Sequence, residues 1–369
     1  MNPQGWASPA LNNSTALYFP SKNRLSAITL SLEGAPSASA AQWNFPDKAR
    51  PDQKDIKVES VYGSPVLDGN AIYFAGYEGD LFAVGTDGTL KWMLKGVSGS
   101  IAGGPTLAGD LLAFGTTEGR LYVVKKSDHT PAPGWPKDGL KFGNGIWAAP
   151  IIKGDVVIVA TMSGEVSAFN LSDGSRAWGG KSFRATGAVP DLQLLDDAHI
   201  FAPSLNKHVY ILNVADGSVA VDFRAADWVW TRAAFRDSTA YFGDFSGKVY
   251  ALDITNGINR WPQPYDTHQK VKAAPAIVGD ALVVVDRKPV AHLIDLKSGT
   301  AINTVPLLNS GTVRADVLPF SSALKGAQTV TTPGPQADRG LIVTTSGKLF
   351  VANPREKTVI EVVVAGGKQ

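Results

Sequence analysis

The sequence predicts an all-β fold, an eight-bladed β-propeller built from four-stranded antiparallel blades. Glycine (38 residues) and proline (23 residues) are abundant, and no amphipathic helical stretch is longer than about two turns. Short runs of Val, Ile, Phe and Tyr are separated by Gly-Asp, Asp-Gly and Asn-Gly pairs, which is typical of strands joined by tight turns. The runs also recur with a period near 42 residues, which is typical of a four-stranded propeller blade.

Two segments show the repeat most clearly: YGSPVLDGNAIYFAGYEGDLFAVGTDGTLKWML from Tyr62 and WAAPIIKGDVVIVATMSGEVSAFNLSDGSRAW from Trp147. Each contains small residues and a proline, an apolar pair, a glycine turn, an apolar strand, a second glycine turn, an alternating strand, Asp-Gly and a strand with Trp. We name the position of the proline the anchor. The anchors are Pro65, Pro105, Pro150, Asp191, Ala233 and Pro275, with spacings of 40, 45, 41, 42 and 42 residues.

Two diverged copies complete the predicted ring. One begins at Trp6 and ends near Phe45, and the other runs from Val313 to about Val364; both carry insertions that we expect to be surface loops. We expect a single propeller domain over residues 1–369. Its blades are predicted at approximately residues 5–50, 61–97, 101–142, 146–184, 187–226, 229–267, 271–309 and 312–365. Both terminal units contain four strands of their own, so we expect the ring to close without a strand exchanged between the termini.

Glycine and tryptophan occupy fixed places in the repeat. Four glycines are predicted to supply the positive φ of hairpin turns: Gly79, Gly119, Gly164 and Gly247. Four pairs before the outer strand are interpreted as type I′ turns, beginning at Asp87, Asp173, Asp216 and Asn256. Three tryptophans close their blades, and we expect them to fill the tapered gap between adjacent blades: Trp92, Trp178 and Trp261.

Composition excludes several classes of function. The net charge of +2 and the scattered basic residues imply no field for binding nucleic acid. The chain has no cysteine, so it forms no disulfide, thiolate metal site or cysteine nucleophile. No apolar run reaches the roughly 18 residues of a membrane-spanning helix. The first residues, MNPQGWASPALNN, have no features of a signal peptide. Either the protein is cytoplasmic or an export signal or anchor is absent from this chain, and we favour the second.

The repeat resembles the PQQ-like repeat β-propeller family, whose blades end in Gly-x-hydrophobic-Tyr-Ala-hydrophobic-Asp…Gly…Trp. SGKVYALDITNGINRW (residues 246–261) matches almost fully, and EGDLFAVGTDGTLKW and SGEVSAFNLSDGSRAW are close. The resemblance covers nearly the whole chain and implies an eight-bladed propeller. Because this fold carries unrelated functions, the resemblance specifies the fold better than the function.

Two branches of that family suggest different functions. The branch of non-catalytic outer-membrane assembly scaffolds similar to BamB has about this length. It implies a protein of the periplasm or cell surface that binds protein partners in the cell envelope, as a monomer and without a cofactor. The other branch contains the PQQ-dependent alcohol and sugar dehydrogenases, which bind PQQ and calcium above the channel. The family also supplies sensor domains of membrane kinases, for which the chain offers no spanning segment.

The sequence departs from the dehydrogenase branch. It lacks the adjacent cysteines and the large insertions that cover the cofactor there, and it has no acidic and amide cluster suited to calcium. The five histidines are spread over several blades without metal-ligand spacing, and we interpret them as turn or edge residues: His129, His199, His208, His268 and His292. We therefore predict no catalytic residue and no metal site. A propeller that binds a quinone or sugar, or a dehydrogenase-like protein, stays the alternative.

The candidate site is a ring of residues at the mouth of the central channel. The innermost strand of each propeller blade lines the axis, so the segment leading into that strand lies at the mouth. Three residues before each anchor stand Trp6, Tyr62, Ala102, Trp147, Ala188, Trp230, Lys272 and Arg314. Trp228 and Arg232 flank Trp230 in the stretch DWVWTRAAFRD. We expect Asp191 to form an ion pair with Arg232 across the mouth.

Three interpretations of this ring stay open. The aromatic side chains could close the axis and pack against neighbouring blades. They could form a contact surface for a protein partner, since Trp, Tyr and Arg are the usual hot-spot residues. They could also line a small-ligand pocket, where Lys272 and Arg314 would suit a planar anion such as a quinone carboxylate and the rings a stacked sugar.

Overall fold

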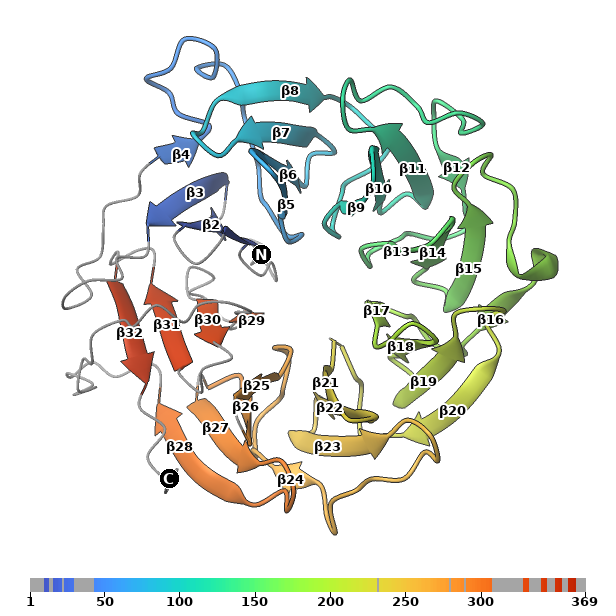
Figure 1. The fold of residues 1–369 in the computed structure, drawn as a ribbon, viewed down its shortest axis with the longest axis vertical. Helices are drawn as coiled ribbons and strands as arrows, with labels where there is room; N and C mark the ends of the chain where they lie inside the picture. The colour runs from blue at the N-terminus through green and yellow to red at the C-terminus, as the bar shows by residue number, and fades with distance from the viewer. Residues whose placement is uncertain are drawn as a thin grey trace.

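The strands of the computed structural model form four-stranded antiparallel sheets that follow one another around a ring (Figure 1). The structure describes residues 10–12, 16–21, 23–29, 43–230, 232–278, 280–288 and 290–306, and the backbone of strands 328–331, 340–343, 349–353 and 358–362. Within these residues there are eight such sheets, each composed of four strands that are consecutive in the chain. The prediction of an all-β propeller architecture is confirmed.

The first four sheets follow the chain from residue 10 to residue 184. Sheet one contains β1 (Ala10–Asn12), β2 (Ala16–Ser21), β3 (Arg24–Thr29) and β4 (Trp43–Phe45). Sheet two contains β5 (Val66–Asp68), β6 (Ala71–Ala75), β7 (Leu81–Gly85) and β8 (Leu90–Leu94). Sheet three contains β9 (Thr106–Ala108), β10 (Leu111–Gly115), β11 (Arg120–Lys125) and β12 (Leu140–Lys141). Sheet four contains β13 (Ile151–Lys153), β14 (Val156–Ala160), β15 (Glu165–Asn170) and β16 (Ser182–Arg184), with the short 3-10 helix η1 (Trp178–Gly180) before β16.

The other four sheets continue the ring. Sheet five contains β17 (Gln193–Leu194), β18 (His199–Pro203), β19 (His208–Asn213) and β20 (Val219–Arg224). Sheet six contains β21 (Ala234–Arg236), β22 (Thr239–Gly243), β23 (Lys248–Asp253) and β24 (Tyr265–Asp266). Sheet seven contains β25 (Ala276–Val278), β26 (Ala281–Val285), β27 (Val290–Asp295) and β28 (Ala301–Pro306). Sheet eight contains β29 (Gln328–Thr331), β30 (Gly340–Val343), β31 (Leu349–Asn353) and β32 (Thr358–Val362).

The terminal sheets do not exchange strands. Sheet one is ordered β1-β2-β3-β4 and sheet eight β29-β30-β31-β32, so each uses only its own part of the chain. In every sheet the first strand lies nearest the centre of the ring and the last lies at the rim (Figure 1). In sheets two to seven this arrangement places the segment before the first strand at the axis, where the candidate site was predicted.

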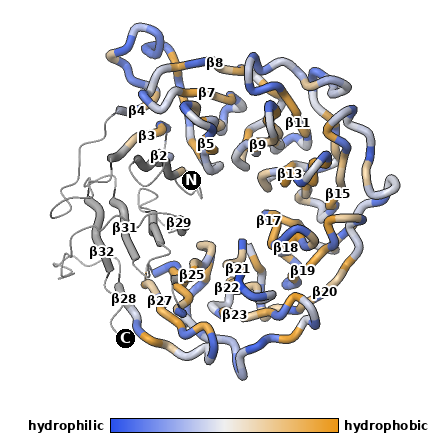
Figure 2. Tube along the Cα trace, viewed as in Figure 1, coloured by the Kyte–Doolittle hydropathy of each residue, from blue (hydrophilic) through white to orange (hydrophobic). Residues whose placement is uncertain are grey.

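The hydrophobic core lies between neighbouring sheets. One cluster combines Ile158 and Val166 of sheet four with Ile200 and Tyr210 of sheet five, and comparable clusters fill the other described gaps. The two middle strands of a sheet are therefore covered on both faces, and every residue of β6 and β7 is buried. Figure 2 shows hydrophobic residues along these inner strands, whereas the connection from β4 to β5 is largely hydrophilic.

Tryptophans close the gaps between blades, as predicted for Trp92, Trp178 and Trp261. Their indole Nε1 groups donate to the backbone carbonyl of the next blade at 2.8–2.9 Å, on Lys126, Val214 and Leu296. Trp261 also covers Gly299, where an added Cβ would lie 2.5 Å from the ring. The same role belongs to two tryptophans that the sequence analysis did not assign, Trp43 and Trp135, which donate to Thr86 and Leu171.

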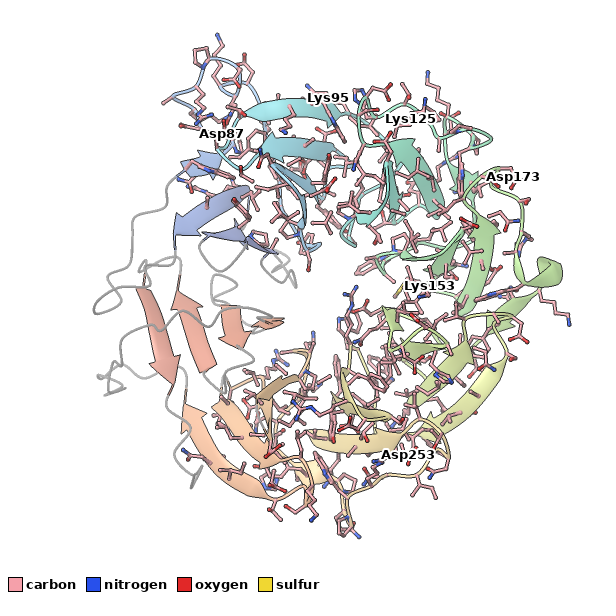
Figure 3. The ribbon with its side chains drawn as sticks, in the orientation of Figure 1. Asp87, Lys95, Lys125, Lys153, Asp173 and Asp253 are labelled. Carbon is pink, nitrogen blue, oxygen red and sulfur yellow. The ribbon has the colours of Figure 1, made fainter. Side chains whose placement is uncertain are left out.

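The prediction of type I′ turns before the outer strands is wrong. In such a turn both central residues have positive φ, but only the glycines do here, for example Gly88 at +82° and Gly174 at +70°. The aspartates instead accept hydrogen bonds from the residue two positions later, at 3.0 Å from Thr89 to Asp87 and 2.9 Å from Ser175 to Asp173. Figure 3 shows Asp87, Asp173 and Asp253 toward the outside of the ring. The hairpin glycines Gly79, Gly119, Gly164 and Gly247 have positive φ as predicted.

Candidate functional site

One cavity collects the segments that lead into the first strands of six blades. Its volume is about 370 Å³, and residues from Tyr62 in sheet two to Ala274 before sheet seven line it. Since six blades contribute to a single cavity, it lies where they converge, at the axis of the ring. We name it the channel-mouth cavity. Predicted site residues on its wall are Tyr62, Trp147, Trp230, Arg232 and Lys272.

The structure also gives a position for Trp228. Trp228 does not line the channel-mouth cavity: its side chain is 45% exposed and contacts Phe245 with 6.1 Å between ring centres. Trp6 and Arg314 lie outside the described residues, so the structure gives no position for them.

Ala188 was placed in the ring by an error of register. Gln193 pairs with Phe201 just as Val66 pairs with Tyr73, so the anchor of sheet five is Leu192 and not Asp191. Val189 is fully buried like Val229, and the residue after it, Pro190, lines the cavity at the place of Trp230. The segment leading into sheet five is therefore one residue shorter than its neighbours.

The tryptophans of DWVWTRAAFRD sit on a segment held by buried hydrogen bonds. Asp244 is completely buried and accepts from the amide of Asp227 at 3.0 Å and from the hydroxyl of Tyr250 at 2.8 Å. The Tyr250 hydroxyl in turn accepts from the amide of Ala226 at 2.8 Å. Burial, with the carboxylate of Asp244 close by, raises the pKa of Tyr250 well above its ordinary value. The segment before Trp228 is thus fixed on the scaffold.

The ring of Trp230 forms one side of an aromatic and cationic cluster. It stacks on Phe245 with 6.1 Å between ring centres and an interplanar angle of 28°. The ammonium group of Lys272 lies 5.5 Å from the centre of the Trp230 ring and 5.2 Å from that of Phe245. Burial lowers the pKa of Lys272, and the positive charges of Arg287 and Lys270 lower it further.

Asp191 and Arg232 form the ion pair that the sequence predicted. The Arg232 Nε lies 3.2 Å from each carboxylate oxygen of Asp191, and the pair joins sheets five and six at the cavity wall. Beside it the amide of Ala233 donates to the side chain of Gln193 at 2.8 Å. Arg232 is exposed, so the pair adds little stability and mainly orients the guanidinium at the rim.

Tyr62 has a packing role on the opposite wall. It is only 4% exposed and meets the Tyr77 ring edge-on, with 4.8 Å between the ring centres. Burial raises the pKa of its hydroxyl. Trp147 and Trp230 are only partly buried. All three aromatic residues line the cavity, but Tyr62 is almost fully packed whereas Trp147 and Trp230 keep part of their surface exposed.

Phe245, Lys270 and Arg287 were not predicted from the sequence, although a regular spacing marks the turn residues Phe245 and Arg287. In sheets two to seven a turn amide donates to the carbonyl of the residue 17 positions earlier, as in Phe245 to Trp228 and Arg287 to Lys270, both at 2.9 Å. This spacing brings each turn beside its own leading segment. A search of the repeat at this offset would have placed Phe245 next to the tryptophans.

Four of the five histidines lie beside an aspartate carboxylate: His199 beside Asp196, His208 beside Asp222, His268 beside Asp266 and His292 beside Asp286. His292 is buried, so its interpretation as a turn or edge residue is wrong. Among the residues that the structure describes, no group of three or more His, Cys, Asp and Glu could hold a metal ion. In the same residues no helix is long and apolar enough to cross a membrane.

Fold and site together define a repeat propeller that presents aromatic and cationic side chains at its channel mouth. The chain belongs to the PQQ_2 family, described as outer membrane protein assembly factor BamB, whose family model matches residues 7–132, 147–236 and 206–360. The resemblance predicted from the sequence is confirmed.

Individual relatives are distant. The chain is 24% identical over 254 residues to the outer membrane protein assembly factor BamB of Shewanella oneidensis, covering 66% of this chain and 62% of that protein. It is 26% identical over 339 residues to the BamB of Legionella pneumophila, covering 75% of this chain and 83% of that protein. The chain spans less than two thirds of the Shewanella oneidensis and Moranella endobia proteins that it matches.

Two solved structures share the fold. BamB from Moraxella catarrhalis has a TM-score of 0.61 at 13% identity and covers 83% of this chain and 96% of its own. The computationally designed Ika8 protein has a TM-score of 0.60, also at 13% identity, and covers 98% of this chain and 100% of its own. At this identity the similarity concerns the fold alone.

Proposed function

We propose that this protein is a non-catalytic assembly factor that binds protein partners of the cell envelope through its channel-mouth face. Its family model is described as outer membrane protein assembly factor BamB, and the relatives reported above carry that name. In this proposal residues 1–369 form one eight-bladed propeller that works as a monomer outside the cytoplasm, in the periplasm or at the cell surface. It has no catalytic residue and no cofactor.

The observation that carries the proposal is the placement of the tryptophans. Trp147 and Trp230 face the channel-mouth cavity, and Trp228 stands exposed beside it on the segment that Asp244 holds. Large aromatic side chains on a fixed backbone are the usual centres of protein interfaces, because they lose little conformational freedom on binding. The middle strands of six blades keep this face rigid, so the mechanism is display of contact residues on a scaffold.

Three variants test the proposal: Trp147→Ala, Trp228→Ala and Trp230→Ala. Ile258→Ala is the matched control, because Ile258 is 62% exposed and does not line the channel-mouth cavity. Recovery of envelope proteins from the source organism is measured by quantitative mass spectrometry, after crosslinking to each purified variant.

We expect wild type and control to recover the same outer-membrane assembly protein. The tryptophan variants should recover at least about tenfold less of it, the effect of one hot-spot residue, while keeping the wild-type circular dichroism. Unchanged recovery by all three folded variants would show that another face is used.

A further inference from the structure

Two lysines that lead into sheet seven lie against Phe245 and Trp230 of sheet six, and Arg287 follows in the turn beside them. The ammonium groups of Lys270 and Lys272 lie 5.4 Å and 5.2 Å from the centre of the Phe245 ring, and Lys272 also faces Trp230. The amide of Arg287 donates to the carbonyl of Lys270 at 2.9 Å, so Arg287 belongs to the turn beside them. Of this cluster, Trp230 and Lys272 line the channel-mouth cavity.

The charge of this cluster is not balanced within the described part of the chain. Four nearby carboxylates are paired with other side chains: Asp191 with Arg232, Asp227 with Lys207, Asp266 with Lys248 and Asp286 with His292. The fifth, the buried Asp244, accepts hydrogen bonds from the Tyr250 hydroxyl and from backbone amides. Among the described residues none forms an ion pair with Lys270, Lys272 or Arg287. Lys272 is partly buried, so water compensates its charge less well than that of an exposed lysine.

The shape of the site favours a polypeptide over a small molecule as the source of an anion that would balance these positive charges. A cavity of about 370 Å³ is at the lower end of ligand sites, which span roughly 300–1,000 Å³, so it accommodates a side chain comfortably. Phe245 continues the surface out of the cavity, because it contacts Trp230 inside and Trp228 outside. A ligand confined to the cavity would leave Trp228 exposed.

We propose, resting on the proposed function, that the channel-mouth cavity binds an acidic side chain of the protein partner, with the carboxylate at Lys272 and a neighbouring apolar residue on Trp228 and Trp230. The Lys272 ammonium supplies a charge-assisted hydrogen bond to the carboxylate. Arg232 takes a smaller part, since Asp191 already neutralises it. The acidic residue makes the recognition of the partner specific, and the aromatic side chains supply most of the contact area.

A pair of short peptides tests the charge. The probes are acetyl-Leu-Glu-Leu-amide and acetyl-Leu-Gln-Leu-amide, which differ in one ionisable group, and sodium acetate represents a free carboxylate. Binding to the full chain is followed by tryptophan fluorescence and calorimetry at low salt. Lys272→Met keeps most of the side-chain volume, and Lys288→Met is the control, because Lys288 is exposed on the same blade and does not line the cavity.

We expect the Glu peptide to bind at least about tenfold more tightly than the Gln peptide, a preference typical of a charge-assisted contact. Lys272→Met should abolish that preference and Lys288→Met should retain it. Equal binding of the two peptides would overturn the proposal, and so would no detectable binding of either. Acetate binding as tight as that of the Glu peptide would also overturn it, because the site would then serve a free anion.

Failure of this inference is distinguishable from failure of the proposed function. If the tryptophan variants lose the envelope partner but Lys272→Met retains it fully, the face is an interface without the acidic contact. If the tryptophan variants retain the partner, the proposed function itself is wrong.

Discussion

The ammonium group of Lys272 lies 5.5 Å from the centre of the Trp230 ring, which belongs to the neighbouring blade. A lysine over an indole gains roughly 0.5–1 kcal/mol at an exposed site. Here the same lysine is also partly buried and has Arg287 and Lys270 nearby. The contact therefore joins a favourable aromatic interaction to an unfavourable concentration of positive charge.

Replacing Lys272 should change the free energy of unfolding little at neutral pH. The size of the change should depend on pH. Burial, then Arg287 and Lys270, lowers the pKa of Lys272, so the unfolded chain binds its proton more tightly than the folded one. The resulting loss of folding stability is fully present below the pKa that Lys272 has in the folded protein. It disappears as pH rises toward the ordinary lysine pKa of about 10.4. For Lys272→Met we expect a free energy of unfolding within about 1 kcal/mol of wild type at pH 7, since the lost cation–π contact offsets the relief.

Urea unfolding of wild type and Lys272→Met at pH 7 and pH 10 measures this difference. Wild type should gain stability relative to the variant as pH rises. A relative loss would mean that the charged form of Lys272 is favoured in the folded protein.

The buried carboxylate of Asp244 should be essential for the segment that carries Trp228. Asp244→Ala leaves the Tyr250 hydroxyl and the amide of Asp227 without their acceptor. We expect a loss of about 2–4 kcal/mol, since each buried polar group without a partner costs about 1–3 kcal/mol. Hydrogen exchange should show faster exchange at Asp227 and Phe245 but not at Ile158 in sheet four. Uniformly faster exchange would indicate global destabilisation instead of a local anchor.

The tryptophan between blades should contribute through both its ring and its hydrogen bond. Trp261 is 2% exposed and donates to the carbonyl of Leu296 at 2.9 Å. Trp261→Ala should lower the free energy of unfolding by about 3–5 kcal/mol. Trp261→Phe, which keeps an aromatic ring but loses the donor, should cost about 1–3 kcal/mol. Urea denaturation measures both, and equal losses would assign the whole effect to the hydrogen bond.

The glycine beneath that tryptophan should tolerate no side chain. Gly299 has a φ of +73°, and a Cβ added there would lie 2.5 Å from the Trp261 ring. Gly299→Ala should cost about 1–3 kcal/mol, the usual range for a non-glycine residue held at positive φ. Gly143→Ala is the control, because nothing lies within 4 Å of its added Cβ and its φ is ordinary. Comparable thermal melting of the two variants would contradict the packing argument.

The turn aspartates should make the fold sensitive to acid. Hydrogen bonds from Ser175 lower the pKa of Asp173, so the folded protein releases this proton more readily than the unfolded one. The stability that the ionised Asp173 contributes is fully present above the ordinary aspartate pKa of about 3.9. It is lost as pH falls through the lower pKa of the folded protein. Asp173→Asn should melt below wild type at pH 6, and the difference should disappear near pH 2. A constant difference in Tm between the two proteins would exclude the ionised carboxylate as its cause.

The repeat allowed most of the fold to be predicted, because each blade expresses the same physical requirements. Apolar pairs, turn glycines and closing tryptophans recur at nearly constant spacing, and the structure places Trp92, Trp178 and Trp261 as expected. Trp135 was not predicted to close a gap between blades, because it follows Ala-Pro-Gly instead of Asp-Gly, in a loop before the two-residue strand β12. Its role depends on the distance to the next blade, which the local pattern does not contain.

The positions of the candidate-site residues at the cavity were predicted where the register of the repeat was regular and mispredicted where it was not. Trp147, Trp230 and Lys272 lie three residues before true anchors and face the cavity. In sheet five the pairing of Gln193 with Phe201 sets the register, and a shortened leading segment moves Pro190 into the position assigned to Ala188. Phe245 could not be found from its own strand, because it contacts the tryptophans through a turn that folding brings beside them.

The central claim is that the channel-mouth face contacts the protein partner, and photocrosslinking tests it most directly. A photoreactive phenylalanine analogue is placed at position 228, beside the cavity, and in a second variant at position 258, away from it. Both are irradiated in the envelope of the source organism, and crosslinked peptides are sequenced by mass spectrometry. We predict that position 228 crosslinks an outer-membrane assembly protein and position 258 does not. Crosslinks to that protein from 258 alone would contradict the claim.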